Sequence, residues 1–366
     1  MLKCLTRCSS PFRKTLLTAV AAPNASTFLN VLPTEPLYRL DDDSMRLAIR
    51  HRLGLPPSDS LTSQHCVCTR PDFIFASDPD HFHSCNLTRT NSLTLRHDQL
   101  VHTIAELSRE AGWHATREPM HHLRPLDPAA AAAVASSVDP ADPDDLDNCN
   151  FPAHWNRHGD LLLLRHDKKL YIDVAVTRPT NDSNLAHHSR VATDTLHSTK
   201  QVASRKHAKY DAIAELNKYT MLPFVLESYG GLGPEAVRVI DFLAASSSDM
   251  SEKEFRKHAY RRIAVCLQRG NAHIGLLGQQ QMHIRRQVAN SRTVDSAFRL
   301  NTRQLPTQLS GSTLRHRLEP WLSASDAAGA QAAASELESA DPGTVGTNSG
   351  FIHRRVAGIA DFAACA

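Results

Sequence analysis

The sequence predicts an α/β fold of the mixed, α+β kind, in which helices cover a sheet built around a central hairpin. Residues 161–164 are four consecutive leucines, a run with the length of a buried strand. Residues 170–177 alternate apolar and polar side chains, which is the pattern of a strand with two unlike faces. Amphipathic segments at 96–113 and 199–219 flank this hairpin in the sequence and are expected to form helices.

The composition excludes some classes of protein. At 366 residues and 41% hydrophobic content, the chain can bury a core and has room for two modules. No apolar run reaches the length of a membrane span, so we expect no membrane partner. Eight cysteines without a secretory signal indicate reduced thiols or metal ligands in an intracellular protein. The net charge of +3 is too small to indicate nucleic-acid binding by itself.

Residues 1–60 are expected to form a helical or irregular N-terminal segment. The start of the chain is basic and free of acids, which is compatible with a transit peptide. The alternative is that the chain begins inside a longer gene product. Acidic residues at 41–43 precede a short helix that we expect at 45–55.

The next segment contains two half-sites for a metal ion. Cys66 and Cys68 form the first, and His81 and Cys85 form the second, with twelve residues between them. Thiolates and an imidazole are the ligands of tetrahedral zinc sites, so the segment is predicted to be a zinc module. His83 could replace His81, because both lie on the same loop. The C-x-C spacing is tighter than the common C-x2-C, so a cysteine-rich loop without metal is the alternative.

Two glutamates follow this module. Glu106 lies at the edge of the apolar face of the first helix, and Glu118 lies in a short extended piece after it. Either could approach a metal site, and a solvated side chain is the alternative for both. Residues 127–148 are mostly alanine, proline and aspartate, which cannot offset the entropy of ordering, so we expect a disordered insertion there.

The hairpin carries two carboxylates. Asp160 precedes its first strand, and Asp173 lies inside the returning strand among β-branched residues. A carboxylate there costs stability unless it is hydrogen-bonded, exposed or bound to a cation. Two carboxylates from adjacent strands would suit a hard divalent ion such as Mg²⁺.

Two basic helices follow the hairpin. Lys206 and Lys209 share a flank of the helix at 199–219. After a strand at 224–226 and a glycine turn that does not match a phosphate-binding loop, a capping box at 251–254 begins another helix. Its basic residues could follow a phosphate backbone, and an ordinary solvated face is the alternative. The residues singled out for nucleic-acid contact are Lys253, Lys257, Arg261 and Arg262.

The order of these motifs resembles a known arrangement. C-x-C, D-H-x3-C, RH-x-x-L and D-x12-D occur in sequence between residues 66 and 173. This order resembles the C-terminal region of non-LTR retrotransposon reverse transcriptases, in which a CCHC zinc-knuckle-like motif precedes a restriction-endonuclease-like PD-(D/E)xK domain. The resemblance covers roughly residues 25–275 and implies a zinc module at 61–92, a restriction-endonuclease-like domain at 93–275 and a low-complexity, largely disordered tail at 276–366.

The resemblance also implies roles for individual residues. The zinc ligands would be Cys66, Cys68, His81 and Cys85. Asp160 and Asp173 would hold Mg²⁺ in a catalytic site to which Glu118 could contribute. The motif lysine is replaced by Ala175, so Lys206 or Lys209 would take its place, and His158-Gly159 stands where the family has proline or Arg-Pro. No Tyr-x-Asp-Asp box occurs, so the polymerase part is absent.

The function that these expectations imply is Mg²⁺-dependent hydrolysis of DNA, in the nucleus, with structural zinc assisting nucleic-acid binding. RNA is the alternative nucleic acid. A second reading is a catalytically inactive, nucleic-acid-binding remnant, because Ala175 departs from the motif. A third reading is a structural protein whose acids are merely solvated.

Overall fold

The computed structural model describes residues 10–68, 74–85, 87–88, 92–119, 159–181 and 188–303, with side chains in the last range given for 190–288. The chain divides into two compact units, Met1–Thr293 and Val294–Ala366, and the fold below is that of the first. The expected insertion at 127–148 and the tail beyond residue 303 lie outside the described residues.

A four-stranded mixed sheet forms the centre of the first unit, so the predicted mixture of helices and sheet is confirmed. The strands lie in chain order. The first two pairs are antiparallel and the last pair is parallel. Parallel neighbours need a crossover connection, and α8 (His197–Leu216) provides it. The strands are β1 (His114–Arg117), β2 (Leu161–Arg165), β3 (Lys168–Thr177) and β4 (Thr220–Glu227).

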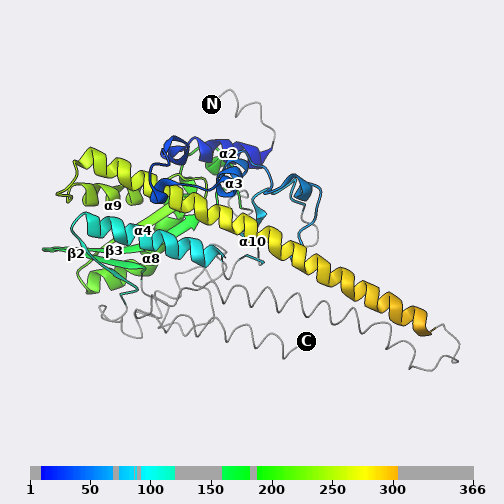
Figure 1. Cartoon of the computed structure of the whole chain (residues 1–366). Coiled ribbons are helices and arrows are strands. Elements are labelled where there is room, and N and C mark those ends of the chain that lie inside the picture. Colours follow the sequence, from blue (N-terminus) through cyan, green and yellow to red (C-terminus); the bar gives the residue numbers. More distant parts are fainter. Residues whose placement is uncertain are drawn as a thin grey trace, which may run out of the picture. The chain divides into compact units, whose positions relative to one another are not determined.

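The alternation in β3 sorts its side chains between two apolar clusters. Leu170, Ile172 and Val174 belong to the main core, which also contains residues of three helices. Tyr171 points the other way and packs with Tyr210 of α8. Burying each such large side chain contributes about 1.5–3 kcal/mol, so the alternation explains why helices cover both faces. The helices of the main core, which can be followed in Figure 1, are α4 (Thr94–Glu110), α9 (Pro234–Ala244) and α10 (Glu252–Arg303).

The N-terminal segment contributes two helices and several short turns. Asp41 accepts a hydrogen bond of 2.8 Å from the amide of Ser44 and caps α3, which therefore begins before the helix expected at 45–55. No helix in the described part of the chain has the length and apolarity needed to cross a membrane. The remaining elements are α2 (Pro11–Val20), α3 (Asp42–Arg52), α7 (His188–Val191) and the 3-10 turns η1 (Thr27–Asn30), η2 (Pro36–Tyr38), η3 (Asp59–Leu61) and η4 (His81–His83).

Helix α10 extends further than the sequence indicated. Residues 276–303, which we assigned to a low-complexity tail, continue the helix. Ile274 and Met282 of α10 pack with the segment that carries the cysteines. Gly278 permits this contact, because a Cβ atom there would lie 2.5 Å from the ring of Phe82. Contacts with the cysteine segment stabilise the helix around Ile274 and Met282, and such contacts between distant segments cannot be read from local composition.

A buried carboxylate ends β4. Glu227 is 2% exposed, and its Oε1 atom accepts a 2.8 Å hydrogen bond from Ser198. Among the described residues, its Oε2 atom has no hydrogen-bond partner. Burial raises the pKa of Glu227 to about 7.

Glu227→Gln should therefore stabilise the protein increasingly as the pH rises from about 4.5 to 7. The pKa is raised from 4.5 to about 7, so the native state holds this proton more tightly and stability falls as pH rises through that window. We expect Glu227→Gln to raise the free energy of unfolding by about 3 kcal/mol at pH 8 and to change it little at pH 4.5. Urea denaturation at both pH values measures this. The exposed Glu215→Gln is the control, and an equal effect of Glu227→Gln at the two pH values would contradict the assignment.

Candidate functional site

The four predicted zinc ligands converge. One ligand atom from each of Cys66, Cys68, His81 and Cys85 lies within 4.8 Å of all the others. The Sγ atoms of Cys66 and Cys85 are 3.7 Å apart, and Cys68 Sγ is 3.4 Å from His81 Nε2. A tetrahedral zinc site with metal–sulfur bonds of about 2.3 Å has sulfur–sulfur edges of about 3.8 Å. The cluster could therefore bind a metal ion, and its donor set is compatible with zinc.

The cluster has a small apolar core of its own. Phe75 and Phe82 are buried with ring centroids 4.9 Å apart, and both pack among Leu61, Ile274 and other apolar residues. The amide of Phe75 donates to the carbonyl of Gln64 at 3.2 Å, and this bond closes a loop that carries the first half-site. Apolar packing and one backbone bond thus bring the two half-sites together.

Electrostatics favour a thiolate at Cys66 and a charged imidazole at His81. The contact with Cys85, whose sulfur is 3.7 Å away, lowers the pKa of Cys66. The same contact raises the pKa of Cys85. Because thiolate is the form that binds metals, one cysteine is already prepared for a cation. At His81, burial disfavours the charged ring, but Asp78 and the cysteines outweigh it and raise its pKa to about 9.

His83 lies in a different environment from His81. Its ring stacks on His51 with centroids 4.6 Å apart, and its Nδ1 atom is 3.2 Å from the guanidinium of Arg96. Burial holds the pKa of His83 well below its ordinary value. His81 is thus the histidine that faces the thiols.

The two carboxylates lie on adjacent strands. Leu161 pairs with Ile172, so Asp160 and Asp173 occupy the next positions of the β2–β3 pair. Asp160 Oδ2 accepts a 2.6 Å hydrogen bond from the amide of Val174. Asp173 is 3% exposed, and its Oδ2 atom lies 3.0 Å from Lys206 Nζ.

These carboxylates do not form a closed ligand set. Within the described residues, the cysteine–histidine cluster is the one group in which three or more His, Cys, Asp or Glu ligand atoms lie within 4.8 Å of each other. The contacts of Asp160 with His97 and with the amide of Val174 are both made by its Oδ2 atom. Within the described residues, the carboxylates therefore do not form a prearranged metal site.

His97 of α4 is a member of this site that we did not single out from the sequence. Its Nε2 atom is 3.2 Å from Asp160 Oδ2 and 3.2 Å from the carbonyl oxygen of Val174. Burial lowers the pKa of His97, but Asp160 outweighs this effect and raises it to about 10. The RH-x-x-L motif contains this residue, and only the contact across the fold shows that it faces Asp160.

The other predicted site residues are distributed around the hairpin. The amide of Glu118 donates to the carbonyl of Asp160 at 2.9 Å, while its side chain is exposed. Lys206 Nζ lies 3.0 Å from Asp173 Oδ2. The Nζ atoms of Lys206 and Lys209 lie 6.0 Å and 5.0 Å from the ring centroid of Tyr210.

The basic helix divides its cations between surface and core. Lys253 and Lys257 are exposed, and Arg261 is half-buried. Arg262 is 4% exposed and pairs with Glu106 at 2.5 Å and with Glu110. Arg262 therefore joins α10 to α4, and three of the four residues expected to contact nucleic acid remain on the accessible side.

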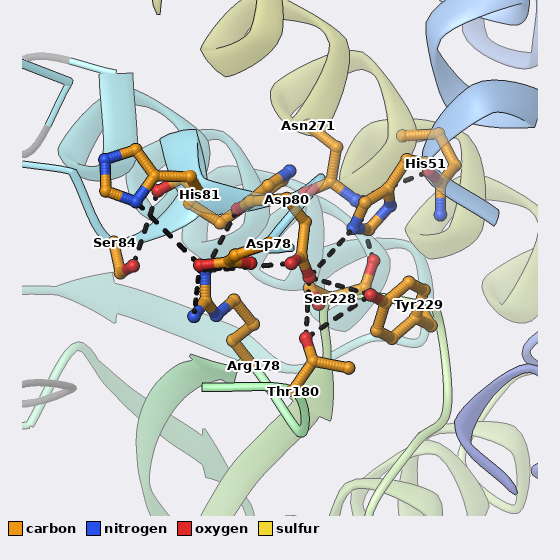
Figure 2. Close-up of polar contacts among 12 residues, drawn as sticks. His51, Asp78, Asp80, His81, Ser84, Arg178, Thr180, Ser228, Tyr229 and Asn271 are labelled. Atoms are coloured by element: carbon orange, nitrogen blue, oxygen red, sulfur yellow. Dashed lines mark hydrogen bonds and ion pairs between the residues drawn. The ribbon is translucent and has the colours of Figure 1, made fainter. Parts of the chain in front are cut away.

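A buried polar network joins the cysteine segment to the sheet (Figure 2). Asp80 accepts hydrogen bonds from Thr180 at 2.6 Å and from Tyr229 at 2.7 Å, and its carbonyl accepts one from Arg178 at 3.1 Å. His51 stacks on Tyr229 with centroids 4.4 Å apart. Burial alone would raise the pKa of Asp80, yet Arg178 and the other partners lower it overall. No sequence pattern pointed to this network, since its members are far apart in the chain.

Comparison with protein-family models, with curated proteins and with solved structures finds no match for this chain.

Removal of the metal should destabilise the protein through the cysteine–histidine cluster. We expect one zinc ion per chain and, with free zinc at a hundred times the dissociation constant, an added stability of about 2.7 kcal/mol. The Cys66→Ser substitution should abolish both the zinc binding and the stability that zinc adds. Metal analysis after desalting and thermal denaturation with and without chelator measure this. Cys266, which is half-buried on α10, supplies the control, and a Cys266→Ser variant that loses zinc equally would refute the assignment.

Proposed function

We propose that this chain is a metal-dependent DNA endonuclease in which a zinc module assists nucleic-acid binding. The observation that supports it best is the contact of Lys206 with Asp173, beside Asp160 on the adjacent strand. Lys206 of α8 is therefore the residue that we propose in place of the PD-(D/E)xK motif lysine, whose position holds Ala175 in this chain. The order α4, β1, β2, β3, α8, β4 also agrees with the αβββαβ arrangement that this resemblance implies.

The residues of the site have separable roles in this proposal. A divalent ion such as Mg²⁺, held by Asp160 and Asp173, would polarise the scissile phosphate and acidify a bound water. Lys206 neutralises Asp173 in the protein alone and would stabilise the negative charge that develops on the phosphate. His97 and the amide of Val174 both contact Oδ2 of Asp160 and so position this carboxylate.

Substrate binding would depend on cations at some distance from the carboxylates. Lys253 and Lys257 are exposed near the start of α10, and the zinc module packs on a later part of the same helix. Contacts of this kind with the phosphate backbone position a duplex without reading its sequence. RNA binding would use the same contacts.

Asp173→Asn should abolish cleavage while leaving DNA binding nearly intact. The substitution keeps the shape of the side chain and removes the charge that would hold the ion. We expect at least a hundredfold slower nicking of supercoiled plasmid in Mg²⁺ or Mn²⁺. Asp167→Asn, at the exposed tip of the same hairpin, is the matched control and should cleave normally. Equal rates of plasmid nicking by the Asp173→Asn variant and the wild type would contradict the proposed nuclease function.

Lys206→Met should reduce cleavage more than Lys209→Met does. Removing one preorganised cation from a developing charge typically costs 10²–10³-fold in rate, and we expect a loss of about a hundredfold at Lys206. Lys209, which lies over Tyr210, should matter only a few-fold. Single-turnover cleavage rates, with DNA affinity measured in parallel, test this. A larger effect at Lys209 would reverse the assignment of the lysines.

The second candidate is a non-catalytic nucleic-acid-binding protein. Ala175 at the motif position favours it, as does the lack of a closed ligand set at the carboxylates. It requires that the wild type and the Asp173→Asn variant bind DNA with the same salt dependence, that EDTA leaves this binding unchanged, and that neither protein cleaves.

A further inference from the structure

The imidazole of His81 is held from two sides. Its Nε2 atom faces the thiol cluster, 3.4 Å from Cys68 Sγ, and its Nδ1 atom lies 3.8 Å from Asp78 Oδ2. The ring of Phe75 meets it edge to face, with centroids 5.7 Å apart and an interplanar angle of 88°. These contacts make Nε2 the nitrogen that would bind a metal and turn Nδ1 toward a carboxylate.

Asp78 is held in turn by Arg178, which directly follows β3. The NH2 atom of Arg178 is 3.3 Å from Asp78 Oδ2, and NH1 is 3.5 Å from Oδ1. Arg178 is 5% exposed, and its NH1 atom also lies 3.7 Å from Asp80 Oδ1 (Figure 2). The carboxylate behind His81 therefore cannot turn away without breaking buried contacts at the end of the strand that carries Asp173.

We propose that Asp78 is a positioning residue of the metal site, which holds His81 with Nε2 toward the metal, and that Arg178 ties this arrangement to the end of β3. Histidines that bind zinc usually donate their second N–H to a carboxylate or carbonyl, and losing that partner typically weakens metal binding 10–100-fold. The 3.8 Å contact is longer than a hydrogen bond. A bound cation makes Nδ1–H a stronger donor, and we expect the contact to shorten in the metal-loaded protein.

The inference rests on the zinc part of the proposed function and is independent of cleavage. A purely structural role for Asp78 is the competing explanation, because Asp78 also pairs with Arg178. In that case Asp78→Asn would lower the melting temperature without changing the affinity of the folded protein for metal. The test must therefore measure the affinity and the coordination of the bound metal, and not only the stability of the fold.

The experiment measures zinc affinity of the full chain by competition with a chromophoric chelator. Asp78→Asn should bind zinc about 10–100-fold more weakly than the wild type. The visible absorption of bound Co²⁺ should lose intensity or shift, and ¹⁵N NMR of the zinc-loaded wild type should show His81 protonated at Nδ1. Asp59→Asn removes a charge that is 92% exposed in the same part of the chain and should change none of these readings.

Asp78→Glu provides a second variant with the charge retained. It should recover most of the lost zinc affinity, and it replaces Asp78→Asn as the decisive variant if the latter does not fold. The inference would be overturned if the Asp78→Asn variant bound zinc as tightly as the wild type. It would also be overturned if the Asp78→Glu variant bound zinc no better than the Asp78→Asn variant. A wild-type protein that nicks DNA but binds no zinc would also overturn the inference. A protein that binds zinc in a way that depends on Asp78 but cleaves no DNA would support the inference and contradict the proposed nuclease function.

Discussion

The buried contact of Arg178 with Asp78 and Asp80 is the interaction on which the arrangement of this protein depends. Arg178 follows β3, and the two aspartates belong to the cysteine segment, about a hundred residues earlier in the chain. Taking these charges out of water is costly, and removing one partner of such a pair typically destabilises a protein by about 3–5 kcal/mol. Thr180 and Tyr229 both donate to Oδ2 of Asp80, and Arg178 lies 3.7 Å from Oδ1, so the network joins the segment to the sheet.

Helix α10 makes the same connection through apolar contacts. Its first turns place Phe255, Ala259 and Ile263 in the core above the sheet, and Ile274 and Met282 then enter the core of the cysteine segment. The metal cluster and the carboxylate hairpin are therefore parts of one packed unit.

The carboxylate site is assembled from three elements around two positions of one hairpin. The hairpin provides Asp160 and Asp173, α8 provides Lys206, and α4 provides His97. Each carboxylate thus meets a cationic or potentially cationic partner from a different helix. That arrangement reconciles an acidic residue inside a β-branched strand with the cost of burial, whatever chemistry the site performs.

Local patterns were enough to predict the hairpin, the helices that flank it and the grouping of Cys66, Cys68, His81 and Cys85, because periodicity and spacing are properties of short stretches of chain. Antiparallel pairing of the two strands places Asp160 and Asp173 at neighbouring positions of the hairpin. The choice of Lys206 over Lys209, the position of His97, the burial of Arg262 and the Asp80 network depend on contacts between residues tens to hundreds of positions apart. Such contacts are decided by how the helices pack on the sheet, and α10 remains helical past residue 276 where it packs with the cysteine segment.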